Sequence, residues 1–156
     1  MTPETVQVKF VNDNVTISKC HEIRRKVFVK EIGIRQNVEL NDDDKFATHL
    51  IAIINRSPAG TLCFRVIDNK TVKIDRLAVY RQYRRLGVGS SLVSTLEKYV
   101  KANKLPNKFE LEATIDAVKF WEKLGWTSFR SKFHQEGVNV PIIWMKKYSD
   151  SNGFIG

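Results

Sequence analysis

The chain has 156 residues, of which 42% are hydrophobic and 28% are charged. This length and composition are typical of one folded globular domain, and they exclude a fibrous or disordered chain. Lys and Arg number 26 against 17 Asp and Glu, and the resulting formal net charge of +9 favours anionic partners. The basic residues form no run longer than three and show no zinc-finger spacing, so we do not expect a nucleic acid-binding module.

The cysteines and the apolar runs indicate the compartment. Cys20 falls in a predicted helix and Cys63 in a predicted strand, with no cluster of metal ligands, so we expect buried free thiols, no bound metal and a reducing compartment. The first residues lack a basic segment followed by an apolar one, and the apolar run at 50–54 is too short to cross a bilayer. We therefore expect a cytoplasmic protein without membrane contact, and the nucleus is the other compatible compartment.

The N-terminal half is predicted to contain a strand, a helix and three further strands. Apolar and polar residues alternate over 5–11, which indicates a half-buried strand. Apolar residues then recur every three or four positions from Asn14, which predicts an amphipathic helix that ends near Gly33. A polar, acidic stretch at 37–47 is expected to be a loop. Three strands in an antiparallel meander, with short turn-rich connections, are expected at 48–54, 60–67 and 71–79.

The C-terminal half is predicted to contain two helices and three strands. Their order along the chain is helix 87–103, strand 108–113, helix 116–125, and strands 126–134 and 140–148. The complete order β-α-β-β-β-α-β-α-β-β predicts a mixed α+β domain with an antiparallel half and at least one crossover. Residues 149–156 are mostly small and polar, so we expect a single domain over 1–148 followed by a frayed tail.

The segment YRQYRRLGVGSSLV at 80–93 is predicted to connect a strand to a helix through a basic turn that contains glycines. The first N–H groups of a helix have no intrahelical partner and lie at the positive end of the helix dipole, so anions bind there. Gly87 and Gly89 lack a Cβ and would let a phosphate group approach the backbone, while Arg84 and Arg85 would add charge. On these residues alone, a solvated loop without a ligand is an equally good interpretation.

This turn and two other segments resemble the GNAT superfamily of N-acetyltransferases. RRLGVG at 84–89 fits the family pattern Q/R-x-x-G-x-G/A between a strand and a helix. VFVKEIG at 27–33 resembles the end of the first helix in a small, single-domain, bacterial-type subgroup, and AVKFWEKLGW at 117–126 resembles the segment A-x-x-F-Y-x-x-x-G-F. The resemblance covers residues 5–147. It implies the GNAT acyl-CoA N-acyltransferase fold, an α+β fold with flanking helices and a mixed, mostly antiparallel sheet of about six to seven strands.

The resemblance also implies acetyl-CoA as the co-substrate. The pyrophosphate would rest on backbone amides of the glycine turn, with Arg84 and Arg85 at its rim. The pantetheine arm would bind along the preceding strand like an added strand, and Trp121 would pack against the coenzyme or the core. The positions concerned are Leu86, Gly87, Val88, Gly89 and Ser90 for the amides and Leu77, Ala78 and Val79 for the strand.

The implied activity is transfer of the acetyl group to a primary amine of a small molecule or peptide, by direct attack in a ternary complex. The enzyme would act as a monomer or homodimer. The alternative is a coenzyme-A-binding module with weak or no transferase activity. Trp121 keeps this alternative open, because it stands where many members have a tyrosine that protonates the leaving thiolate, and an indole N–H is a poor acid.

Two carboxylates are candidates for the base that removes a proton from the amine, whose pKa of about 10.4 keeps it charged at neutral pH. Asp75 precedes Leu77 by two residues and is expected on the same face of its strand, and Glu112 lies on the next strand. The alternative for both is a surface charge beside Lys73, Arg76 or Lys108.

The polar loop bears on the identity of the acceptor. Four of its residues are acidic and would favour a cationic amine such as a polyamine or a lysine-bearing peptide, and the alternative is a solvated acidic loop without a ligand. These residues are Glu39, Asp42, Asp43 and Asp44.

Overall fold

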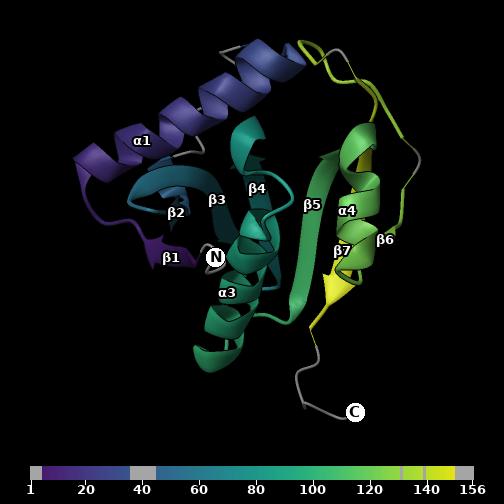
Figure 1. Ribbon diagram of the computed structural model, residues 1–156. Coiled ribbons are helices and arrows are strands. Elements are labelled where there is room, and N and C mark those ends of the chain that lie inside the picture. The colour runs from purple at the N-terminus through teal and green to yellow at the C-terminus, as the bar shows by residue number, and fades with distance from the viewer. Residues whose placement is uncertain (1–4, 36–44, 131, 139, 150–156) are drawn as a thin grey trace.

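The computed structural model describes residues 5–35, 45–130, 132–138 and 140–149. Seven strands in this part of the chain form one mixed sheet in the order β1-β2-β3-β4-β5-β7-β6 (Figure 1). Neighbouring strands are antiparallel, except that β4 and β5 are parallel. The predicted α+β fold class and number of strands are therefore confirmed. The strands are β1 (Val6–Phe10), β2 (Thr48–Ile54), β3 (Ser57–Ile67), β4 (Thr71–Val79), β5 (Lys108–Thr114), β6 (Thr127–Ser128) and β7 (Ile142–Tyr148).

The helices form where the apolar spacing predicts them. Asp13 caps the first one by accepting a hydrogen bond from the Thr16 N–H at 2.8 Å, and Gly33, with φ 91°, ends it. Its second half winds as a π-helix, which the sequence did not indicate. No helix among the described residues is long and apolar enough to cross a membrane. The helices are α1 (Asn14–Arg24), the π-helix η1 (Arg25–Ile32), α3 (Val88–Ala102) and α4 (Val118–Lys123), with short 3₁₀ turns η3 (Arg81–Tyr83) and η4 (Ile115–Ala117).

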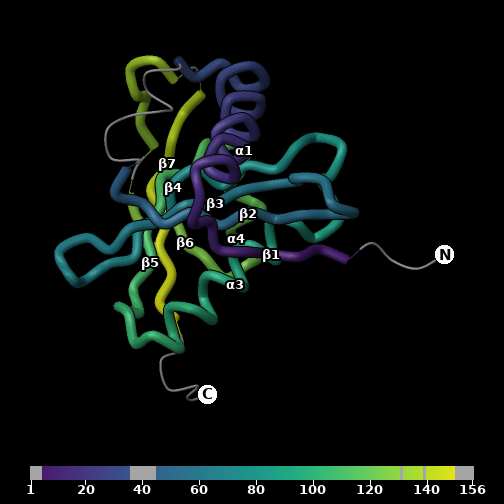
Figure 2. Tube along the Cα trace, turned by 90° about the vertical axis from the view of Figure 1, so that its left-hand side faces the viewer, coloured from purple at the N-terminus to yellow at the C-terminus, as the bar shows by residue number. Residues whose placement is uncertain are grey.

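The helices cover opposite faces of the sheet and give it two hydrophobic cores. The larger core joins α3 and α4 to one face, for example through Leu92 and Trp121. The smaller core joins Cys20 and Ile23 of α1 to Ala78 of β4 on the other face. Figure 2 shows this arrangement, with α1 above strands β2 and β3 and α3 below them. A ligand that passes between two strands would therefore meet a different helix layer on each side.

Two predicted strand boundaries are wrong. The stretch 55–59 was predicted as a connection, but β3 begins at Ser57. Asn55 and Arg56 both have positive φ, and such a two-residue turn matches the twist of a hairpin, so the strand starts at once. The stretch 126–134 was predicted as a strand, but β6 has only two residues. Its aromatic residues recur every three or four positions rather than every second one, which does not fit a pleated strand.

The C-terminal limit of the domain stays a prediction. The Ser149 N–H donates a hydrogen bond to Asn107 O at 2.7 Å, so the chain is still attached to the sheet region at that residue. Residues 150–156, which include most of the expected frayed tail, lie outside the described residues.

Candidate active site

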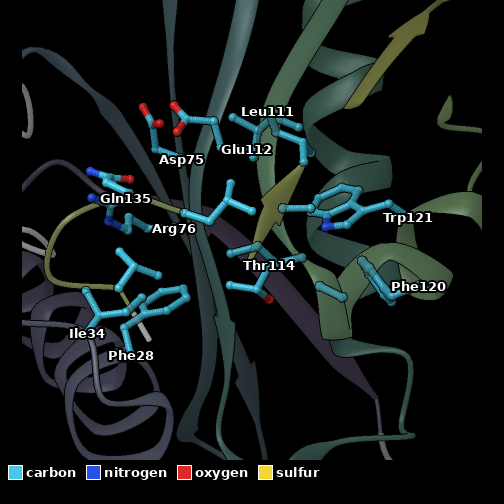
Figure 3. A pocket seen from close by; sticks show the side chains of 16 residues that line it. Phe28, Ile34, Asp75, Arg76, Leu111, Glu112, Thr114, Phe120, Trp121 and Gln135 are labelled. Carbon is cyan, nitrogen blue, oxygen red and sulfur yellow. The ribbon is translucent and has the colours of Figure 1, made fainter. Parts of the chain in front are cut away.

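A cavity lies where β4 and β5 separate (Figure 3). In the described residues, the parallel pairing of the two strands is confined to Val72 and Lys73 of β4 with their partners on β5. Beyond this point, residues 74–77 of β4 and 111–114 of β5 line a cavity of about 160 Å³. Separated strands leave backbone groups that a ligand can pair with, because backbone N–H and C=O groups are obligatory hydrogen-bonding groups. The residues of each strand were predicted, but their separation is visible only in the structure.

A β-bulge in β4 decides which side chains face the cavity. Arg76 has φ 55°, and Arg76 and Leu77 together lie opposite a single residue of β3. The extra residue reverses the in–out alternation of the strand. Leu77 consequently packs towards the core under α3 and α4, whereas Ala78 lies in the core under α1. Asp75 shares the face of Ala78, so the prediction that it shares the face of Leu77 is wrong.

Asp75 and Glu112 lie side by side at one end of the cavity, as Figure 3 shows. Lys73 Nζ lies between them, 2.9 Å from Glu112 Oε1 and 3.6 Å from Asp75 Oδ1. Arg65 Nε donates a further hydrogen bond to Asp75 Oδ2 at 3.2 Å. The Lys73 side chain is only 13% exposed, and its ammonium group also lies 5.3 Å from the centre of the Trp144 ring. Both carboxylates thus line the cavity and pair with Lys73, one of the three neighbours named in the alternative interpretation.

The glycine turn lies next to this cavity. Gly87 has φ 80° and directly precedes α3, and a Cβ added to it would have no atom within 4 Å. A Cβ on Gly89 would lie 2.9 Å from Phe120 Cζ and 3.9 Å from Leu77 Cδ2, two side chains that line the cavity. Gly89 is therefore required for packing against α4, a reason that the sequence did not reveal. The turn exposes Arg85, Leu86, Gly87 and Ser90 and buries Val88 and Gly89.

Arg84 is not a solvated rim charge. Its Nε donates to Val79 O at 3.0 Å, and its two terminal nitrogens donate to the two carboxylate oxygens of Glu31 at 2.6 and 3.0 Å. This forked hydrogen bond holds the pKa of Glu31 below its usual value, and the nearby charge of Arg81 acts in the same direction. Arg84 therefore ties the glycine turn to the end of β4 and to the π-helix.

Trp121 occupies the boundary between the core and the cavity. It is 4% exposed, and its ring centre lies 5.1 Å from that of Phe120 and 5.1 Å from that of Trp126. It also lines the cavity opposite the end that holds Phe28 (Figure 3). Of the two roles that the sequence left open, packing in the core is therefore present, and contact with a coenzyme stays a prediction.

Sequence reasoning missed one wall of the cavity. This wall consists of Phe28 in the π-helix η1, Ile34 just after it, and Gln135 and Val138, which precede β7. The two segments are about a hundred residues apart, so no local pattern connects them. Part of the signal was available, because the motif VFVKEIG contains Phe28.

Two other expectations concern metal and the acidic loop. Where the chain is described, its His, Cys, Asp and Glu side chains form no group of three that could hold a metal ion. The loop residues Glu39, Asp42, Asp43 and Asp44 lie outside the described residues, so their contribution to the site stays a prediction.

Comparisons with known proteins agree with this geometry. The model of the Acetyltransferase (GNAT) family matches residues 17–126. A candidate acetyltransferase of Bacillus subtilis strain 168 is 30% identical over 149 residues, which cover 94% of this chain and 99% of the relative. The crystal structure of a candidate N-acetyltransferase from Lactobacillus plantarum has a TM-score of 0.81 at 21% identity and covers 92% of this chain and 97% of its own. The crystal structure of an aminoglycoside 6′-N-acetyltransferase complexed with coenzyme A has a TM-score of 0.72 at 15% identity. The match covers 91% of this chain and 96% of that one.

Proposed function

The chain belongs to the GNAT family of acetyltransferases, and from this premise we propose that it transfers an acetyl group from acetyl-CoA to the primary amine of a small molecule or peptide. The amine nitrogen attacks the thioester carbonyl carbon directly in a ternary complex. A C–N bond forms, the C–S bond breaks, one proton leaves the nitrogen, and free coenzyme A departs with an amide as the other product. The observation that carries this proposal is the cavity between β4 and β5, which Asp75 and Glu112 line and whose lining residues Leu77 and Phe120 also lie near Gly89 of the glycine turn.

The residues present fit the coenzyme. The open space at Gly87 and the first-turn N–H groups of α3 suit a pyrophosphate, and the positive end of the helix dipole favours its charge. We assign this contact to Leu86, Gly87, Val88, Gly89 and Ser90, and we assign hydrogen bonds to the pantetheine arm to Leu77, Ala78 and Val79. Arg85 adds charge from the surface, and Arg84 acts by holding the turn. The solved aminoglycoside acetyltransferase of the same fold, complexed with coenzyme A, supports the assignment.

The proton of the attacking amine needs an acceptor, and Asp75 and Glu112 are the carboxylates in reach of the cavity. Lys73 holds both of them in position through its ion pairs. A thiol has an ordinary pKa of about 8.5, so coenzyme A can leave as a thiolate without a general acid that protonates it. Trp121 is thus compatible with turnover as a packing residue.

A coenzyme-A-binding module with weak or no transferase activity is the second candidate. The ion pairs of Asp75 and Glu112 favour it, because Lys73 and Arg65 already occupy acceptor positions of these carboxylates. Both candidates share the coenzyme site, and they differ in turnover alone.

Two measurements test these candidates. Calorimetry with acetyl-CoA should show binding at micromolar concentration, and release of free thiol should exceed the hydrolysis background when a suitable amine is added. Failure to bind either acetyl-CoA or coenzyme A would contradict both candidates. Binding without any acceptor-dependent release of thiol would contradict the transferase and support the coenzyme-A-binding module.

The carboxylates are tested by amide substitutions. At least one of Asp75→Asn and Glu112→Gln should lower kcat by about a hundredfold with little change in the KM for acetyl-CoA, since the loss of a general base removes a factor of this order. The matched control is Glu110→Gln, because Glu110 lies on β5 but pairs with Lys108 at 2.9 Å and does not line the cavity. Equal effects of all three substitutions would show that neither Asp75 nor Glu112 acts as the base.

A further inference from the structure

The cavity opens towards both faces of the sheet. On the face covered by α3 and α4 it is lined by Leu77, Phe120 and Trp121, which belong to the larger core or pack against it. On the face covered by α1 it is lined by Asp75 and by Phe28, which packs against the smaller core. The glycine turn is at the start of α3, so a coenzyme bound there occupies the first side. The second side is left for the acceptor.

The acceptor side has a charged end and an apolar end. Asp75 and Glu112 lie at one end, and Phe28 and Ile34 lie together at the other, as Figure 3 shows. Val138 adds to the apolar wall. Gln135 and Arg76 line the cavity between the two ends, so an acceptor meets its apolar contacts at the end that holds Phe28 and Ile34.

Backbone hydrogen bonds hold the apolar wall in place. The Ile34 N–H donates to Phe28 O at 2.8 Å, a bond that closes the end of the helix across the left-handed Gly33. The Arg35 N–H donates to Gly137 O at 3.0 Å, which joins this segment to the one that precedes β7. A wall fixed in this way can select an acceptor by shape, because its side chains need little reordering on binding.

Among the described residues, the charges around the cavity, which include Arg76, do not favour a polycation. The two carboxylates, Asp75 and Glu112, already have two cationic partners, Lys73 and Arg65. One ammonium group can still use their remaining acceptor sites, because a carboxylate offers about four lone-pair positions. A second ammonium group on the same acceptor would lie against Phe28 and Ile34 and would lose hydration there, and none of the described carboxylates lines that end of the cavity.

We propose that the acceptor is a primary monoamine with a compact apolar body, of alkyl or arylalkyl type, which Phe28 and Ile34 select. This inference rests on the proposed acetyl transfer. The size of the cavity agrees with a compact body, because the acceptor shares about 160 Å³ with the reactive end of the coenzyme. Phe28 and Ile34 are specificity-determining residues for this acceptor. Its amine lies at the carboxylates and its apolar body lies on the wall.

A matched pair of amines tests the inference. Pentylamine and cadaverine have the same five-carbon chain and differ only in the second amino group. At saturating acetyl-CoA, kcat/KM measured by thiol release should be at least about tenfold higher for pentylamine, because burial of an unpaired ammonium group is costly. Phenethylamine should behave like pentylamine.

Two variants show whether the wall causes the preference. Ile34→Asp places a carboxylate at the half-buried apolar end, so it should raise kcat/KM for cadaverine, lower it for pentylamine and leave the KM for acetyl-CoA unchanged. The control is Val15→Asp, which adds the same charge to α1 at a position that is 69% exposed, and it should change neither value. Phe28→Ala should raise the KM for pentylamine in a protein whose thermal melt shows that it is folded.

The possible results separate the two proposals. A protein that does not bind acetyl-CoA in calorimetry contradicts the proposed function and this inference with it. A protein that binds acetyl-CoA but acetylates cadaverine as well as pentylamine, or acetylates polyamines alone, contradicts only the inference. An unchanged preference in both folded Ile34→Asp and folded Phe28→Ala also overturns it.

Discussion

At the scale of single residues, three glycines near the candidate site are required for three different reasons. Gly87 has a left-handed φ of 80° and open space around it, so its backbone conformation is what excludes most side chains. Gly89 gives room to the Phe120 ring. Gly60 allows close approach of backbone to backbone, because a Cβ there would lie 2.9 Å from Ala78 O and 2.9 Å from Val88 Cγ1. The sequence assigned a role to the first two and placed the third at the start of a strand.

The Gly60 contact leads to a prediction about stability. Gly60→Ala should lower the free energy of unfolding by about 1–3 kcal/mol, the usual cost of an extra methyl group in a packed core. Urea unfolding monitored by tryptophan fluorescence measures this change. Gly87→Asn is a suitable control, because Asn tolerates the left-handed region and the site has room for its side chain, so it should cost less. Equal costs would show that the close approach to β4 is easily relieved.

At the scale of elements, the π-helix η1 connects the two functional regions. It carries Phe28 of the cavity wall and Glu31, the partner of Arg84 in the glycine turn. Wider helical turns of this kind are rare and occur frequently at functional sites. The ion pair therefore joins the segment that we assign to the acceptor to the turn that we assign to the coenzyme.

Glu31→Gln tests this connection through its pH dependence. The pKa of Glu31 is lowered in the folded protein, so its carboxylate stabilises the fold at pH values above the ordinary pKa of 4.5, and this contribution is lost as the pH falls through the lowered pKa. We expect a loss of about 0.5–1 kcal/mol at pH 7, because the pair is partly exposed, and a smaller difference from the parent at acidic pH. Urea unfolding at several pH values measures both. The control is Glu22→Gln, at an exposed position of α1. If the loss in free energy of unfolding caused by Glu31→Gln did not become smaller at acidic pH, the ion-pair explanation would be contradicted.

At the scale of the whole molecule, the net charge of +9 should assist the binding of a polyanionic coenzyme. The two arginines of the turn should contribute in different ways. Arg85 is exposed and acts through its charge, whereas Arg84 also holds the backbone at Val79 O.

Salt titrations of acetyl-CoA affinity distinguish these contributions. The loss of acetyl-CoA affinity caused by Arg85→Ala should nearly disappear at high salt, because the Debye length falls from about 10 Å at 0.1 M to about 3 Å at 1 M. The deficit of Arg84→Ala should persist, since it includes a displaced turn. Calorimetry at several salt concentrations gives both values, and a deficit of Arg84→Ala that vanishes with salt would mean that this residue too acts only as a charge.

The sequence by itself determined the order of the elements, the α+β class and the family, because periodicity and short motifs are local properties of the chain. It also singled out the glycine turn and the two carboxylates at the cavity. It failed where the outcome depends on how distant segments pair. The bulge at Arg76 puts Asp75 and Leu77 on opposite faces of β4. The bulge itself depends on how β4 pairs with β3.

Only the tertiary structure decided the shape of the candidate site. The separation of β4 and β5, the wall of Phe28 and Ile34, and the ion pair of Arg84 with Glu31 each join segments that are far apart in the sequence. Such contacts are set by the packing of the sheet between its two helix layers. No local pattern encodes them, because a side chain's own neighbours in the sequence do not specify what lies across a strand gap.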